Sequence, residues 1–243
     1  MTEPLPIVLV HGAWHGAWCW SALQAELDRR GLASYAVDLP GHGASTLPLG
    51  DLHGDAQLVA DSIDALGCDV VLVGHSYGGS VITEAATRTS RVRHLVYLTA
   101  FVPDDGESLM GLLGSMPPAD VPLSAAMLPQ EDGTSLIDPA GAVAAFYAEC
   151  PPAVADAAIR RLSPQPFATF TQPTTGAPWR TIASTYVRCT KDQAIHIDHQ
   201  TLMASRCGDV RTLETDHSPF ASAVEGTADI VESVVRAGEA ALA

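Results

Sequence analysis

The chain reads Val-Val-Leu-Val-Gly-His-Ser-Tyr-Gly-Gly over residues 70–79, and an apolar helical stripe begins at Val81. Four consecutive apolar residues suit a strand buried on both faces, so Ser76 stands between a strand and a helix. In that setting, the glycines of a Gly-x-Ser-x-Gly pattern permit the sharp turn that lifts the serine hydroxyl above a sheet. The stretch therefore predicts a nucleophilic serine at the start of a helix.

Short apolar runs like residues 70–73 recur along the chain, and helical periodicities separate them. The other runs cover residues 7–10, 34–37, 95–98, 184–187 and 210–213. This alternation predicts the α/β class, with an open parallel sheet that helices cover on both faces. A capping box formed by Ser222 and Glu225 predicts where the last helix begins.

Residues 103–178 break this alternation, because they hold 12 of the 17 prolines. Proline lacks the N–H that a central strand needs, so the segment is not expected to form sheet. Its apolar residues instead predict short helices and turns, inserted between the fourth and fifth strands over the ligand-binding end of the sheet. The expected division is a core of residues 1–102 and 180–243 with a lid of residues 103–179. A small second domain unrelated to the site is the alternative.

A serine hydroxyl is a poor nucleophile at neutral pH and needs a base. In this architecture an acid and then a histidine follow the serine along the chain. His217 stands between the last strand and the last helix, so it is the expected base. His196 and His199 are rivals, but they follow the fifth strand closely and are expected at a solvated helix start.

The expected acid is Asp192, in the turn after the strand over residues 184–187, where it can hold the imidazole in the right tautomer. Asp104 and Asp105, after the fourth strand, are the runners-up. Asp216 precedes the histidine directly, and adjacent side chains seldom face each other.

The negatively charged oxygen of an acyl-transfer intermediate needs two aimed donors. One is expected from the backbone N–H of Tyr77, the residue after the serine. The other is expected from the loop after the first strand, at Ala13. The neighbouring Trp14 is expected to line the pocket.

Composition excludes several other functions. The formal net charge is −15, which disfavours binding to nucleic acids and anionic membrane surfaces. No apolar segment is long enough to span a membrane, and the amino terminus shows no signal peptide. The five cysteines are scattered without a Cys-x-x-Cys pair, so we expect reduced thiols and a cytoplasmic location.

Neither a metal nor an organic cofactor is expected. His196, Asp198 and His199 resemble part of a His-x-His-x-Asp-His metal motif, but position 194 is alanine. The glycines of residues 41–43 lack the third glycine of a dinucleotide-binding loop, and no Walker lysine exists.

Three motifs in order carry a family resemblance: residues 11–20, residues 38–43 and residues 74–79. Together they resemble the α/β-hydrolase superfamily, and within it the plant methylesterase and hydroxynitrile lyase group with its bacterial carboxylesterase relatives. The resemblance implies a six-stranded core, a helical lid and a triad of Ser76, Asp192 and His217. It also indicates a homodimer.

Two positions separate the branches of that group. In the hydroxynitrile lyases a threonine occupies the place of Gly12, and a lysine that steadies the departing cyanide follows the catalytic histidine. Here Ser218 follows the histidine, and the only lysine in the chain is Lys191. Gly12 leaves room for an acyl oxygen. The sequence therefore predicts the esterase branch.

The expected reaction is hydrolysis of a small to medium apolar or aromatic carboxylic ester, with methyl esters among the candidates, through an acyl-enzyme. Further residues expected to contact the substrate are Gly12, Phe101, Leu109, Phe146, Phe167 and Trp179. Two alternatives remain: a ligand-binding signalling protein on the same scaffold, and a lyase or secondary-metabolite enzyme that uses the same triad.

Overall fold

The computed structural model describes residues 4–242. Residues 1–3, which contribute to the expectation of no signal peptide, lie outside that range. Six strands form one parallel sheet, as the alternation of apolar runs and helical segments predicts, and their order in it is β2-β1-β3-β4-β8-β9. The strands are β1 (Ile7–Val10), β2 (Ser34–Val37), β3 (Val70–His75), β4 (Val92–Leu98), β8 (Ala183–Cys189) and β9 (Asp209–Leu213).

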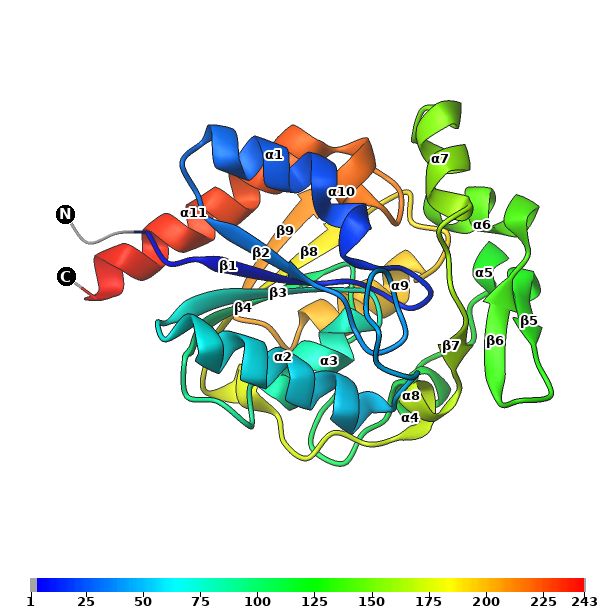
Figure 1. Cartoon of the computed structure of the whole chain (residues 1–243), viewed down its shortest axis with the longest axis horizontal. Helices are drawn as coiled ribbons and strands as arrows, with labels where there is room; N and C mark the ends of the chain where they lie inside the picture. Colours follow the sequence, from blue (N-terminus) through cyan, green and yellow to red (C-terminus); the bar gives the residue numbers. More distant parts are fainter. Residues whose placement is uncertain (1–3, 243) are drawn as a thin grey trace.

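Helices cover both faces of this sheet, and the alternation of side chains along β1 separates the two cores. Ile7 and Leu9 pack in a cluster with α1 (Ser21–Arg29) and α11 (Val224–Leu242). Val8 and Val10 pack in another with α2 (Leu52–Leu66) and α3 (Gly78–Ala85). Figure 1 shows these helix pairs on opposite faces of the sheet. The remaining helices of the core are a 3₁₀ turn (Ala17–Trp20), α9 (Ile197–Ala204) and α10 (Pro219–Ser222).

The predicted capping box at the last helix is wrong. Ser222 ends α10, and its hydroxyl donates hydrogen bonds to Asp216 Oδ1 at 2.6 Å and to the Ser218 carbonyl at 3.0 Å. The Ser222 side chain therefore binds the loop around His217 and does not cap α11. Glu225 lies in the first turn of α11, where a carboxylate favours the positive end of the helix dipole.

The proline-rich segment lies between β4 and β8, the fourth and fifth strands of the main sheet, as expected. It contains a small antiparallel sheet in the order β5-β6-β7, which the sequence analysis excluded. Pro129 ends β5 and Pro166 ends β7, and both strands are edges, where a missing N–H is tolerated. The elements are α4 (Leu109–Ser115), α5 (Pro122–Ala126), β5 (Met127–Pro129), β6 (Thr134–Ile137), α6 (Pro139–Phe146), α7 (Pro152–Ile159), β7 (Gln165–Pro166), α8 (Ala168–Thr171) and a 3₁₀ turn (Pro178–Arg180).

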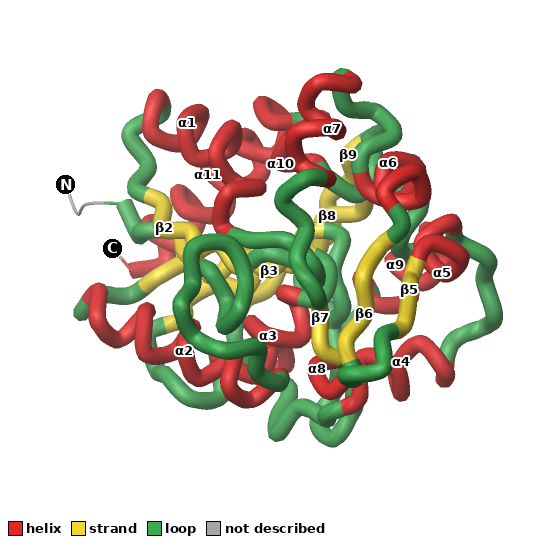
Figure 2. Tube along the Cα trace, turned by 45° about the vertical axis from the view of Figure 1, so that its right-hand side comes forward, coloured by secondary structure: helices red, strands yellow, loops and turns green. Residues whose placement is uncertain are grey.

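This insertion lies beyond the carboxyl ends of β1 and β3 (Figure 1). Figure 2 shows its three short strands side by side, in front of the main sheet. Within residues 4–242, no helix combines the length and the hydropathy that a membrane span requires. All five cysteines are free thiols.

Candidate active site

Ser76 occupies the sharp turn between β3 and α3, in the left-handed region at φ +52°. Few residues other than glycine adopt this conformation, and the strain is characteristic of functional positions. A Cβ added at Gly74 would lie 2.5 Å from the Gly78 carbonyl oxygen, and one at Gly78 would lie 2.6 Å from that of Val10. A Cβ at Gly79 would lie 2.2 Å from a backbone oxygen. The glycines are therefore required by backbone approach, as the motif predicts.

Ser76 contributes to the wall of a cavity of about 320 Å³. Its hydroxyl makes no hydrogen bond to any other residue in the described part of the chain, so it remains available to a ligand. The cavity is mostly apolar and is lined by Ala13, Trp14, Ser76, Tyr77, Phe101, Leu109, Met110, Leu113, Pro117, Pro118, Ala119, Asp120, Val121, Leu123, Ser124, Met127, Phe170, Ala194, Ile195, His196 and His199.

His217 and Asp192, the expected base and acid, are in direct contact. His217 Nδ1 lies 2.7 Å from Asp192 Oδ2, and both side chains are almost completely buried. A carboxylate at Nδ1 selects the tautomer that carries its proton there, which leaves Nε2 as the basic nitrogen. Asp192 comes from the turn after β8, and His217 comes from the loop between β9 and α10.

Four further donors hold the Asp192 carboxylate. Oδ1 accepts the backbone N–H groups of Ala194 at 2.7 Å and Ile195 at 2.9 Å. Oδ2 accepts the Thr99 hydroxyl and, at 3.2 Å, the Gln200 side-chain amide. These bonds fix the orientation of the carboxylate. Thr99 itself has φ +39°, and the sequence analysis found neither this residue nor Gln200, because no motif marks them.

The backbone around His217 is also fixed. His75, the neighbour of Ser76, donates from Nε2 to the His217 carbonyl oxygen at 2.7 Å, so the two candidate catalytic segments are joined directly. Burial holds the pKa of His75 well below its usual value, which keeps the ring neutral. The Asp216 side chain is turned away from the ring of its neighbour His217. Its carboxylate accepts hydrogen bonds from the backbone N–H groups of Ser218 and Glu149.

The two expected oxyanion donors, the backbone N–H groups of Ala13 and Tyr77, belong to residues of the cavity wall. Within residues 4–242, neither amide has a hydrogen-bond acceptor. Buried backbone donors are rarely left without a partner, so an unpaired pair beside a serine hydroxyl is typical of an oxyanion site.

Buried histidines hold the loop after β1. His11 donates from Nδ1 to the Gly12 carbonyl at 2.8 Å, and His15 donates from Nδ1 to the Ala13 carbonyl at 2.7 Å. The Tyr147 hydroxyl donates to His15 Nε2 at 2.7 Å. Burial lowers the pKa of His15 to about 4, so at neutral pH it is a neutral bridge between the insertion and this loop.

Trp14 fastens the same loop to the small sheet of the insertion. Its backbone N–H donates to Gln165 Oε1 at 3.1 Å, and its indole N–H donates to the Ser135 carbonyl at 3.1 Å. The backbone N–H of Ser163 donates to the Trp14 carbonyl at 2.8 Å. Trp14 also has positive φ, at +62°. Gln165 and Ser135 were not found from the sequence, because only the folded insertion brings them to this loop.

The residues expected to contact the substrate fall into two groups. Trp14, Phe101 and Leu109 line the cavity. Four others are absent from the described lining: Gly12, Phe146, Phe167 and Trp179.

Each of these four residues has other neighbours in the structure. Phe146 packs on His217 and on Trp14, with ring centroids 5.6 and 6.0 Å apart, and so covers the histidine from behind. Phe167 packs against Phe170, and Trp179 donates to a backbone carbonyl near the end of β4. A Cβ at Gly12 would lie 2.9 Å from the Ser76 Cβ.

The rival histidines lie at the start of a helix, as expected, but the expected solvent exposure is wrong for His199. His196 precedes α9 as its N-cap, and His199 lies in the first turn of that helix. His199 is buried and donates from Nε2 to the Pro117 carbonyl at 2.7 Å, so it does not lie on a solvated face. Both rings line the cavity, because the insertion covers this end of α9.

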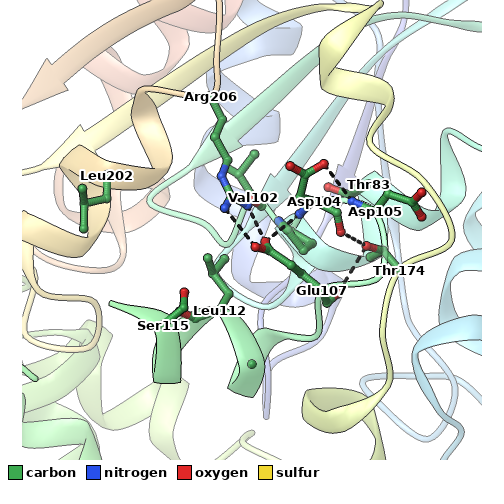
Figure 3. Close-up of polar contacts among 12 residues, drawn as sticks. Thr83, Val102, Asp104, Asp105, Glu107, Leu112, Ser115, Thr174, Leu202 and Arg206 are labelled. Carbon is green, nitrogen blue, oxygen red and sulfur yellow. Dashed lines mark hydrogen bonds and ion pairs between the residues drawn. The ribbon is translucent and has the colours of Figure 1, made fainter. Parts of the chain in front are cut away.

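The runner-up acids lie in a separate polar cluster, shown in Figure 3. Asp104 pairs with Arg180, and its backbone N–H donates to Glu107 at 2.8 Å. Arg206 at the end of α9 binds Glu107 and so ties the start of the insertion to the core. Asp105 is exposed. Lys191 is also at the surface, where it pairs with a glutamate 2.8 Å away.

The fold and this site define a hydrolase of the α/β class with a serine on a strained turn. The chain belongs to the alpha/beta hydrolase family, whose pattern it matches over residues 7–230.

Individual relatives support this family assignment. An esterase of Nocardioides sp. (strain SG-4G), described as carbendazim-hydrolyzing, is 40% identical over 68% of this chain and 71% of its own. The alpha/beta hydrolase nvfD of Aspergillus novofumigatus is 33% identical over 96% of this chain and 97% of its own. The crystal structure of the methylesterase MES16 from Arabidopsis superposes with a TM-score of 0.78 at 27% identity, covering 96% and 99%. The expected likeness to plant methylesterases and bacterial esterases is confirmed, and the chain is an esterase-type α/β hydrolase.

Proposed function

We propose that this protein is a serine carboxylic-ester hydrolase that acts through Ser76, His217 and Asp192 and an acyl-enzyme. One observation carries the proposal. Two unpaired backbone amides, those of Ala13 and Tyr77, belong with an unbonded serine hydroxyl to the wall of a single apolar cavity. The nearby buried pair of His217 and Asp192 supplies a base in a fixed tautomer.

The proposed reaction uses these groups in turn. Nε2 of His217 takes the proton of the Ser76 hydroxyl as Oγ attacks the ester carbonyl carbon, and the amides of Ala13 and Tyr77 hold the resulting oxyanion. His217 then passes the proton to the alcohol oxygen as the C–O bond breaks. Water, deprotonated by the same nitrogen, attacks the acyl-enzyme, and the carboxylic acid leaves with Ser76 restored.

The cavity supports a small to medium apolar or aromatic ester, with methyl esters as the first candidates. Its volume of about 320 Å³ lies at the small end of the range for ligand pockets. The lining is mostly apolar and includes Leu109, Leu113 and Phe170, which offer no charge. His196 and His199 add polar atoms along α9, where a substrate carrying a hydrogen-bonding group would find partners.

Hydrolysis of p-nitrophenyl esters from acetate to octanoate tests the proposal. The comparison is between the wild type and Ser76→Ala, with Ser80→Ala as a matched control. Ser80 is a buried serine on α3 whose hydroxyl has no partner among the described residues. We expect turnover to be lost only in Ser76→Ala, and we expect a fluorophosphonate to label only proteins that retain Ser76. Full turnover in Ser76→Ala would overturn the assignment.

The alternative functions predict different outcomes. A ligand-binding signalling protein would show saturable ligand binding with negligible product release. A lyase of the hydroxynitrile type needs a cation beside the base, but Ser218 holds that position and Lys191 is paired at the surface. Labelling by the fluorophosphonate without turnover on any ester would indicate a live nucleophile with a narrower substrate.

A further inference from the structure

Tyr77 has a second connection that its place after the nucleophile does not explain. Its hydroxyl donates a hydrogen bond of 2.6 Å to Asp55 Oδ2. Both residues are 1% exposed. Asp55 lies in the first turn of α2, which packs beside α3 on the same face of the sheet. One tyrosine thus contributes its amide to the cavity wall and its hydroxyl to a buried carboxyl group.

A buried carboxyl group is a costly partner for a tyrosine. Burial raises the pKa of Asp55 to about 7, with Asp51 adding to the rise and the hydrogen bond from Tyr77 opposing it. Tyr97 on β4 is equally buried, but its hydroxyl pairs with the neutral hydroxyl of Thr83 at 2.9 Å. That pairing satisfies the tyrosine without burying an ionisable group. Since costly buried ionisable groups cluster at functional sites, the carboxyl group at Tyr77 points to a role beyond packing.

The start of α2 is a firm anchor for that carboxyl group. Asp51 caps the helix by accepting the Gly54 N–H at 2.8 Å. Gln172, at the end of α8 in the insertion, bonds both Asp51 and the Leu52 N–H, at 3.0 and 2.8 Å. The position of Asp55 is therefore fixed from the core and from the insertion together.

The peptide unit between Ser76 and Tyr77 is held at its oxygen, which accepts the N–H groups of Gly79 at 3.0 Å and Phe101 at 3.1 Å. Its N–H end is attached to the Tyr77 Cα, which also carries the ring and whose own carbonyl accepts the Ser80 N–H at 2.9 Å. That ring lies edge-on to Phe170 with centroids 5.9 Å apart, and Asp55 fixes its far end. Loss of the hydroxyl contact would let the ring settle differently, which would move the Tyr77 Cα and tilt the planar peptide unit slightly against the two bonds at its oxygen.

We propose that Asp55 is a positioning residue of the esterase site, which acts through the Tyr77 hydroxyl to aim the Tyr77 amide at the developing oxyanion. The inference rests on the proposed function, because it assigns that amide to the oxyanion hole. Asp55 touches no reacting atom. Its contribution should therefore be to kcat, since the amide interaction strengthens as charge develops, and not to KM.

The test compares Tyr77→Phe with Tyr97→Phe. Both changes delete one fully buried hydroxyl, and only the first reaches the site. We expect Tyr77→Phe to lower kcat about 10-fold with KM changed less than about 2-fold, a smaller loss than removing an oxyanion donor outright. Tyr97→Phe should leave both constants near those of the wild type. Thermal unfolding of each variant shows whether the two have lost similar stability.

Substitutions at Asp55 supply the rescue test. Asp55→Leu should reproduce the loss in Tyr77→Phe, and Asp55→Asn, which keeps an acceptor oxygen for Tyr77, should recover most of it. The rate of fluorophosphonate labelling at Ser76 is a second readout that requires the oxyanion site but not a suitable ester. A wild type that neither labels nor hydrolyses any ester would count against the proposed function, whereas one that labels keeps the comparison of the two variants decisive for Asp55. Equal kcat or equal labelling rates for Tyr77→Phe and Tyr97→Phe would overturn the role of Asp55.

Discussion

The two walls of the cavity are built in different ways. On the side of the strand ends, Ser76, Tyr77 and Phe101 are at most 8% exposed, and hydrogen bonds fix the backbone. On the side of the insertion, Met110 is 49% exposed, and its neighbours Pro117 and Pro118 are also exposed. The first wall depends on the placement of single atoms, and the second depends on shape and apolar area. We therefore expect chemistry to be sensitive on one wall and substrate choice to be adjustable on the other.

The largest effect should come from the acid. Asp192→Asn keeps the shape of the side chain but favours the wrong tautomer of His217, so we expect kcat to fall about 10⁴-fold. Asp104→Asn is the control, because Asp104 pairs with Arg180 away from the cavity. Steady-state kinetics on the best ester would measure both. A fall of less than about 10-fold in Asp192→Asn would remove Asp192 from the mechanism.

Gly12→Ala tests how tightly the strand-end wall is packed. The added Cβ would lie 2.9 Å from both the Ser76 Cβ and the His75 Nδ1, so the nucleophile or the loop must shift. A displacement of this size should lower kcat/KM about 100-fold. Gly114→Ala on α4 is the control, because its Cβ would meet nothing within 4 Å. Equal kinetics for the two variants would mean that this wall yields as easily as the insertion.

The buried Asp55 should make stability depend on pH. Burial raises its pKa to about 7 in the folded state, above the value near 3.9 of an exposed aspartate. The unfolded chain therefore releases this proton first, and the contribution of Asp55 to folding becomes less favourable as pH rises. Asp55→Asn cannot ionise. From pH 5 to pH 8, its free energy of unfolding relative to the wild type should rise by roughly 2–3 kcal/mol in urea titrations. A difference that does not change with pH would contradict the raised pKa.

The smallest effect is expected on the insertion wall. Leu109→Ala enlarges the cavity without touching the catalytic atoms, so we expect the preferred ester chain to lengthen, with a change in relative kcat/KM of about 10-fold. Leu128→Ala is the matched control, since Leu128 lies in the same insertion, is 43% exposed and is not part of the described lining. The p-nitrophenyl series measures both. A collapse of turnover on every ester would show that this wall also holds the chemistry.

The sequence predicted the sheet because short runs rich in apolar residues alternate with helical periodicities, although the edge strands β2 and β9 are less buried than the central ones. It singled out Ser76, His217 and Asp192 as candidates because each follows a strand of the parallel sheet, and the carboxyl ends of such strands meet at one edge. It failed for the small sheet of the insertion, where prolines occupy edge strands that local patterns do not distinguish from turns.

By itself, therefore, the sequence determined the fold class and led to a candidate nucleophile, acid and base, since local patterns and chain order indicate them. Only the tertiary structure decided which residues hold those groups in place. Thr99 and Gln200 reach Asp192, and Gln165 reaches Trp14, across 93, 8 and 151 positions of the chain. Contacts of this kind depend on how separate elements pack, and no pattern within one stretch of sequence records them.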